Sequence, residues 1–167
     1  ITAEAAKLTT SGEGSPVIYS TGNIIVNNVN GIANNSEIGV VEGKNSITLT
    51  NSNVTGYKDN GFMLYQSFSG DAESGIARLK VENNTLTTHA TGAFLYVNNT
   101  TAEVDLSNNA ISMPNTSTLV KASADSRWGK TGENGGHLTL RTSNQELSGN
   151  IMADSISTIA LDMTNGS

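Results

Sequence analysis

The sequence lacks cysteine, has only two prolines and carries few charges. Without cysteine there are no disulfides, no thiolate nucleophiles and no cysteine-ligated metals. Nine Lys and Arg against fifteen Asp and Glu give a net charge of −6 at pH 7, which excludes the basic surface of a nucleic-acid or anionic-lipid binder. No apolar run approaches the roughly 18 residues of a membrane-spanning helix. We therefore expect no nucleic-acid partner and no membrane insertion.

The polar content is supplied by Asn, Thr, Ser and 17 Gly, while 36% of the residues are hydrophobic. This mixture favours strands and turns over helices. A helical pattern could be assigned only to residues 3–8, "AEAAKL". At 167 residues the chain is long enough for one domain with its own core, so we expect a single domain over residues 1–167, as part of a longer secreted protein.

A four-position frame recurs along the chain. Ile47, Leu49 and Asn51 alternate with polar residues, and Val54 follows three places after the asparagine. The frame returns at Leu79, Val81, Asn83 and Leu86, and again at Val104, Leu106, Asn108 and Ile111. Weaker copies are Ile24, Val26 and Asn28 with Ile32 displaced, Leu138, Leu140 and Thr142 with Leu147 displaced, and a last copy at Ile159 and Leu161. Successive copies are 23, 32, 25, 34 and 21 residues apart.

Each interval contains a second apolar block, such as "EIGVV" (37–41), "GFMLY" (61–65), "GAFLYV" (92–97) and "STLV" (117–120). Short strands at a period of 20–34 residues predict an all-β fold. The predicted architecture is a single right-handed parallel β-helix of about six coils, with three short strands per coil. The expected internal ladders are Ile47, Leu79, Val104 and Leu138, and Leu49, Val81, Leu106 and Leu140. An antiparallel β-sandwich is the alternative, but it does not predict a frame that recurs in tandem.

The frame asparagines have a structural interpretation. A tight turn between two strands of a coil needs a left-handed residue, which Asn tolerates better than most. Stacked amides can also hydrogen-bond from coil to coil. We therefore predict a structural asparagine ladder formed by Asn28, Asn51, Asn83 and Asn108.

Several stretches carry a resemblance to a known family: "SPVIYSTGNIIV", "EIGVVEGKNSITLTNSNVTG", "FMLYQSFSGDAESG", "TLVKASADSRWG" and "NGGHLTL". This text resembles large secreted bacterial β-helix proteins with pectate-lyase-like coils. The segment "STIALDMTNGS" is similar to the coils of autotransporter and adhesin passengers. The resemblance extends from about Ser15 to Ser167 and implies an architecture rather than an activity, since this fold serves lyases, hydrolases, adhesins and stalks.

Two insertions interrupt the repeat, at residues 66–77 and 121–137. Both follow the third strand of a coil, so we expect them to emerge on the same edge of the solenoid. This edge collects charge and the only tryptophan. A Trp beside an Arg and carboxylates can stack on a sugar ring and bind its hydroxyls. The candidate glycan contacts are Trp128, Arg127, Asp71, Glu73 and Asp125; the simpler interpretation is that Trp128 covers apolar surface beneath its own loop.

Catalysis has weaker sequence support. Asp71 and Glu73 could form a hydrolase acid/base pair, or they could solvate a loop. Glu82 and Asp105 occupy different frame positions, so we expect them not to align as a calcium site would require. His89 and His137 lack partners at metal-ligand spacing. We therefore expect no catalytic residues, no metal and no cofactor.

The expected function is that of a structural or adhesive module of a secreted or cell-surface bacterial protein, located outside the cell and contacting glycans. A polysaccharide lyase or glycoside hydrolase on the same scaffold is the alternative. An exposed terminal strand edge is normally capped or paired, so end-to-end self-association is a further expectation.

Overall fold

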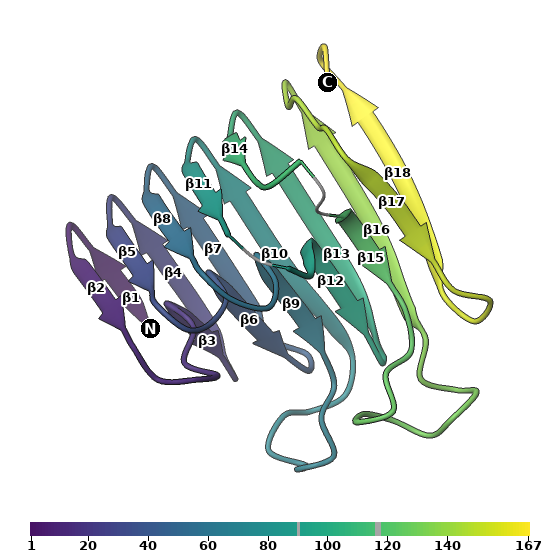
Figure 1. The fold of residues 1–167 in the computed structure, drawn as a ribbon. Coiled ribbons are helices and arrows are strands. Elements are labelled where there is room, and N and C mark those ends of the chain that lie inside the picture. The colour runs from purple at the N-terminus through teal and green to yellow at the C-terminus, as the bar shows by residue number, and fades with distance from the viewer. Residues whose placement is uncertain (90, 116–117) are drawn as a thin grey trace.

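The computed structural model describes residues 1–89, 91–115 and 118–167. They form a right-handed parallel β-helix of eighteen strands in three parallel sheets (Figure 1). Sheet A contains β1 (Thr2–Glu4), β4 (Asn23–Asn27), β7 (Ser46–Thr50), β10 (Ile76–Glu82), β13 (Thr100–Ser107), β16 (Gly136–Ser143) and β18 (Thr158–Thr164). Sheet B contains β2 (Lys7–Thr10), β5 (Asn30–Ala33), β8 (Asn53–Gly56), β11 (Thr85–Thr88) and β14 (Ala110–Ser112). Sheet C contains β3 (Ile18–Ser20), β6 (Gly39–Glu42), β9 (Phe62–Tyr65), β12 (Ala93–Asn98), β15 (Thr118–Ala122) and β17 (Asn150–Ala153).

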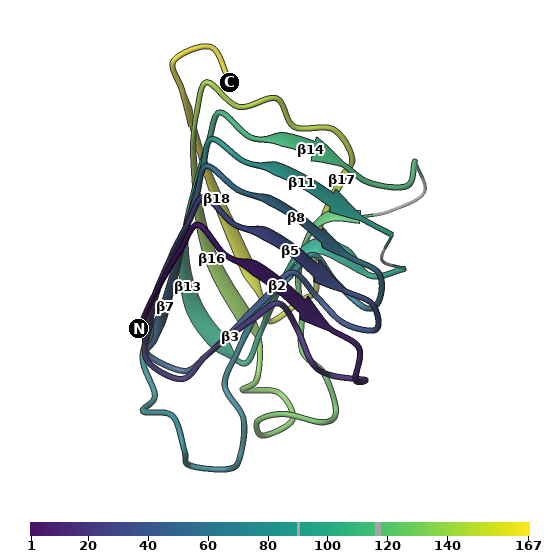
Figure 2. The ribbon, with the colours of Figure 1, turned by 90° about the vertical axis from the view of Figure 1, so that its left-hand side faces the viewer.

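Each of the first five coils passes through sheets A, B and C in turn, and Figure 2 shows the three sheets arranged around the axis that the core residues fill. This confirms the predicted β-helix with three short strands per coil. Six coils are present, and β18 adds a seventh strand to sheet A. The sixth coil differs from the others because sheet B ends at β14. Residues 3–8 are not helical: they belong to β1 and β2, with a left-handed turn at Ala5.

Strand register follows the predicted frame over most of the chain. Ile24 pairs with Ile47, Ile47 with Leu79, and Leu79 with Val104. Ile24 is half-buried, and the other three side chains are almost fully buried. Because side chains alternate between faces, one ladder of such positions fills the core and the intervening positions face solvent.

The predicted register is wrong at β16 by two residues. Leu138 pairs with Ala102 rather than with Val104, and Val104 pairs with Leu140. A shift of two residues keeps the same side chains inside, so hydrophobic alternation alone does not detect it. The correct frame is Leu140, Thr142, Asn144 and Leu147, in which the threonine occupies an apolar position of the core.

The fourth position of the second coil also differs from the prediction. Gly31, and not Ile32, pairs with Val54, while Ile32 pairs with Thr55 and is 39% exposed. A Cβ on Gly31 would lie 2.8 Å from Val17 Cγ1 and 3.0 Å from Val54 Cγ1. The core space at this position is therefore filled by Val17.

The corner at which the chain passes from sheet A to sheet B, the A–B corner, has one conformation in every coil. Asn28, Asn51, Asn83 and Asn108 have φ angles of 54°, 52°, 59° and 54°. Asn144 at 49° and Asn165 at 51° continue the series. Asparagine adopts this left-handed conformation at lower cost than most residues, which accounts for its recurrence.

From the third coil to the sixth, the main stacking at this corner involves the residue that follows the left-handed asparagine. The buried amide ladder, as we name it, consists of Ser52, Asn84, Asn109 and Gln145. The backbone N–H of Ser52 donates to Asn84 Oδ1 (2.8 Å), that of Asn84 to Asn109 Oδ1 (3.1 Å), and that of Asn109 to Gln145 Oε1 (2.9 Å). Each side chain thus provides the acceptor that the buried backbone of the preceding coil requires.

Candidate functional site

The opposite corner, where the chain passes from sheet C to sheet A, is interrupted by two loops. We call it the C–A corner. Loop 1 (66–75) joins β9 to β10, and loop 2 (123–135) joins β15 to β16. Both protrude from the same end of the strands (Figure 1), whereas β12 leads to β13 through Asn99 alone. The shared edge predicted from the sequence is therefore present.

Loop 1 is anchored to the carboxylate of Glu42, which is only 4% exposed. Ser67 donates a hydrogen bond to Glu42 Oε1, and Ser69 donates to the same oxygen at 3.3 Å. The other end of the loop is held by Lys44, whose ammonium lies 3.0 Å from Glu73 Oε1 and whose backbone N–H donates to the Glu73 carbonyl. Loop 1 is thus attached to the preceding coil at both ends.

Two tyrosines extend the hydrogen bonds of Glu42. Tyr19 donates its hydroxyl proton to Glu42 Oε2, and the hydroxyl oxygens of Tyr19 and Tyr65 are 2.8 Å apart. Since a phenol has one proton, Tyr65 is the donor to Tyr19. Burial, followed by the hydrogen bond to Glu42, holds the pKa of Tyr19 well above its usual value. Burial also raises the pKa of Tyr65.

Loop 2 is ordered by an internal ion pair. The Arg127 guanidinium makes two hydrogen bonds to Asp125, from Nε to Oδ1 at 3.0 Å and from Nη2 to Oδ2 at 2.9 Å. The hydrogen bonds from Arg127 lower the pKa of Asp125. Asn134 donates its amide to the carbonyls of Asp125 and Trp128 at 2.9 and 2.7 Å. These contacts fix the backbone on either side of the indole.

The aromatic residues of the two loops meet over sheet C. The ring of Trp128 lies 5.2 Å from that of Tyr65 and 6.4 Å from that of Phe68, centroid to centroid. Trp128 is half-buried, Phe68 is 66% and Tyr19 44% exposed, and Tyr65 is buried at 8% exposure. We call Tyr19, Tyr65, Phe68 and Trp128 the aromatic cluster. Exposed rings on a fixed scaffold are suited to stacking against a flat ligand.

Sheet C continues this surface beyond the cluster. Tyr96 lies beside Met63 in the ladder and is 6% exposed. Burial raises the pKa of Tyr96. The ammonium of Lys121 lies 5.4 Å from the centre of the Tyr96 ring, a distance that allows a cation–π interaction.

The structure separates the residues that the sequence proposed as glycan contacts. Trp128 joins the aromatic cluster, and Arg127 and Asp125 pair with each other beside it. Glu73 pairs instead with Lys44, and Asp71 is exposed. Within the described parts of the chain, neither of these two acids forms a hydrogen bond or an ion pair with Arg127 or Trp128.

Sequence reasoning missed Tyr19, Glu42, Tyr65 and Phe68. Tyr19, Glu42 and Tyr65 lie on β3, β6 and β9 at positions that alternate with inward-facing residues such as Val41 and Leu64. This alternation was visible in the sequence and predicts that they face outward. It does not show that the loops fold back over them.

The acids of sheet A are paired rather than gathered into a site. Arg78 and Arg141 lie 3.5 and 4.0 Å from Glu103, and Arg141 lies 3.8 Å from Asp105. Asp105 pairs in register with Lys80, and Glu82 with Ser107, so Glu82 and Asp105 do not align. Over residues 1–89, 91–115 and 118–167, no group of three or more His, Cys, Asp or Glu side chains is placed to hold a metal ion.

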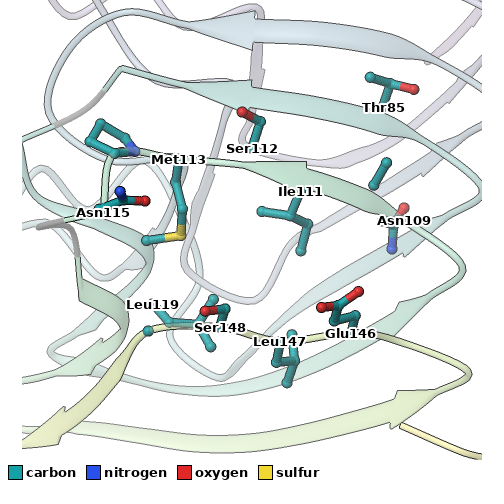
Figure 3. Close-up of a pocket in the computed structure, with 13 residues that line it drawn as sticks. Thr85, Asn109, Ile111, Ser112, Met113, Asn115, Leu119, Glu146, Leu147 and Ser148 are labelled. Carbon is teal, nitrogen blue, oxygen red and sulfur yellow. The ribbon is translucent and has the colours of Figure 1, made fainter.

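A cleft of about 740 Å³ opens beside β14, where the sixth coil has no strand in sheet B. Figure 3 shows β14 and the turn after it on one side of the cleft and residues 146–149 on the other. Half-buried apolar side chains of Ile111, Met113 and Leu147 contribute to its lining together with Asn109 and Glu146. A smaller hollow of about 440 Å³ lies beneath loop 1, between Gln66 and Asn99.

No protein-family model, no curated protein and no solved structure matches the chain. In the part of the chain that the structure describes, no helix is long and apolar enough to cross a membrane. The fold therefore defines the class, a parallel β-helix.

Proposed function

We propose that the chain is a structural and adhesive β-helix module of a secreted or cell-surface bacterial protein, and that it contacts glycans through the aromatic cluster. The observation that carries the proposal is the gathering of Tyr19, Tyr65, Phe68 and Trp128 from three different coils at one corner. Aromatic rings stack on the apolar faces of sugar rings, and neighbouring polar groups bind the hydroxyls.

The scaffold supports such a contact in two ways. The rings of Tyr19 and Tyr65 are carried by β3 and β9, which flank β6 in sheet C. Loop 1 is attached to Glu42, and loop 2 is ordered by its own Asp125–Arg127 pair. A surface already held in its binding geometry loses little conformational entropy when a ligand binds. Polar groups at its border include Lys121 and Ser69.

A glycan array with the native protein and with Trp128→Ala tests this function. Tyr57→Ala provides a matched control, because Tyr57 is 47% exposed and stacks on His89, away from the two loops. We expect Trp128→Ala to weaken glycan binding at least about tenfold and Tyr57→Ala to leave it within about twofold. Absence of binding by the native protein, or equal losses in both variants, would contradict the proposal.

An enzymatic role as a polysaccharide lyase or glycoside hydrolase has less support, because Glu73 is engaged by Lys44 and Asp71 lies in the exposed part of loop 1. The same glycans, incubated with protein in the presence and absence of Ca²⁺, test it. Release of product that disappears in Asp71→Asn would favour the enzyme over the adhesive module.

A further inference from the structure

The aromatic cluster lies above buried negative charge. Glu42 is 4% exposed, and its oxygens accept hydrogen bonds from the hydroxyls of Tyr19, Ser67 and Ser69. Glu42 forms no ion pair with any residue in 1–89, 91–115 or 118–167. Burying a carboxylate without a cation is costly, so this arrangement needs a reason.

The nearby cations are engaged elsewhere. Lys44 is paired with Glu73, and Arg127 is paired with Asp125 through two hydrogen bonds. Lys121 lies over Tyr96 on the next part of sheet C. The Lys44–Glu73 and Arg127–Asp125 pairs are each neutral, whereas Lys121 keeps its charge but lies on β15, two strands away from β9. The surface around Tyr19 and Tyr65 therefore retains the charge of Glu42. A charge in a partly buried site acts over several ångströms, because the protein screens it less than water does.

The rings add to this field in the same sense. The face of an aromatic ring carries negative potential and attracts a cation within about 6 Å. The exposed rings of Tyr19 and Phe68 and the half-buried ring of Trp128, close to a buried carboxylate, therefore favour a ligand that carries a positive charge and has a flat apolar face. A sugar with a free amino group has both properties.

We propose that the aromatic cluster selects cationic saccharides, namely oligomers or polymers of hexosamine with free amino groups. This inference rests on the proposed glycan contact and specifies its ligand class. The ring of Trp128 stacks on the sugar, and the ammonium group lies within the field of Glu42 and against the faces of Tyr19 and Phe68.

The experiment compares two oligosaccharides with the same backbone and length, the β-1,4-linked hexamer of glucosamine and that of N-acetylglucosamine. Affinities are measured by calorimetry at a pH near 6, where the free amines are charged. We expect the glucosamine hexamer to bind about tenfold more tightly than the acetylated one. In Glu42→Gln, which retains the side-chain volume, the preference should fall below about threefold.

Glu42→Gln could also disturb loop 1, so a second test uses a pair of variants at the exposed residue Phe68. Phe68→Lys and Phe68→Gln both remove an exposed ring, and only the first adds positive charge. Phe68→Lys should abolish the preference for the glucosamine hexamer, while Phe68→Gln should weaken both ligands and retain the preference. Equal effects of the two variants would overturn the inference.

The acidic protein could attract any polycation, so Trp128→Ala is measured with the same two hexamers. A preference that survives undiminished in Trp128→Ala would show attraction by net charge and overturn the inference. Equal affinity of the native protein for the two hexamers, or binding of uncharged glycans alone, overturns the inference and leaves the proposed function standing. Absence of binding to any glycan overturns both.

Discussion

The A–B corner and the C–A corner are crossed by every full coil, yet they are built on different rules. At the A–B corner, each coil places one residue in the left-handed conformation, and from the third coil to the sixth the next residue is hydrogen-bonded to its neighbour in the adjacent coil. At the C–A corner, two of the coils depart from the repeat by long loops. Hydrogen bonds between coils restrict the backbone and the choice of residue at the A–B corner. At the C–A corner, insertions are tolerated because they do not change the register of the sheets.

The two corners also differ in how completely their polar atoms are satisfied. Along the buried amide ladder, side-chain oxygens accept the backbone N–H groups of Ser52, Asn84 and Asn109. Buried side-chain atoms without a hydrogen-bond partner, among the described residues, belong to Gln66, Asn98, Ser123, Trp128, Asn134 and Thr142. All but Thr142 lie at or beside the C–A corner. Incomplete satisfaction of this kind is typical of sites that bind water or a ligand.

The largest effect should come from breaking the ladder at Asn109. In Asn109→Ala, the backbone N–H of Asn84 loses its acceptor, and the carbonyl of Val81 loses a donor. With about 1–3 kcal/mol for each buried group left unpaired, we expect the free energy of unfolding to fall by about 2–4 kcal/mol in urea denaturation. Binding at the C–A corner should change by less than about twofold. A loss below about 1 kcal/mol would contradict the structural role of the ladder.

A smaller effect of opposite sign is expected at Thr142. This side chain is 2% exposed, and its hydroxyl has no partner among the described residues. Thr142→Val keeps the shape and removes the unsatisfied hydroxyl, so it should raise the free energy of unfolding by about 1 kcal/mol. In the register predicted from sequence, Thr142 would occupy the left-handed turn, where a β-branched residue is strained. Destabilisation by Thr142→Val would therefore favour that register.

The smallest effect concerns Tyr19 at alkaline pH. Its pKa in the folded protein lies above the ordinary value of about 10. Below about pH 10, the hydroxyl is protonated in both states and its contribution to stability is complete. Above this pH, it ionises first in the unfolded chain, so the free energy of unfolding falls as pH rises.

Urea denaturation at about pH 8 and about pH 10.5 measures this slope. Tyr19→Phe should show a smaller decrease between the two pH values than the native protein. The decrease should not disappear, because the pKa values of Tyr65 and Tyr96 are also raised. An unchanged slope in Tyr19→Phe would contradict the hydrogen bond to Glu42.

The sequence predicted the architecture because the frame combines a two-residue alternation with a fixed asparagine. It placed Ile47, Leu79 and Val104 in one ladder, as the structure does. It failed at Leu138 because a slip of two residues preserves the alternation. The pair Asn144 and Leu147 carried the missing signal, since its spacing equals that of Asn51 and Val54.

The candidate site could be predicted only in part. Trp128 was found because an insertion containing the only tryptophan is conspicuous in the sequence. The contribution of Glu42 depends on the way in which Ser67 and Ser69 bring loop 1 back onto the preceding coil. Such contacts are set by tertiary structure and leave no periodic signal.

The missing strand beside β14 has a consequence for the order in which the molecule opens. The stability of a solenoid is approximately a sum of coil terms and interface terms between neighbouring coils. The interface between the fifth and sixth coils includes strand pairing in sheets A and C, and not in sheet B. Amide protons of β17 should therefore exchange with solvent through a local opening of lower free energy than those of β9 or β12. The cleft would then mark the boundary between two cooperative units of the solenoid.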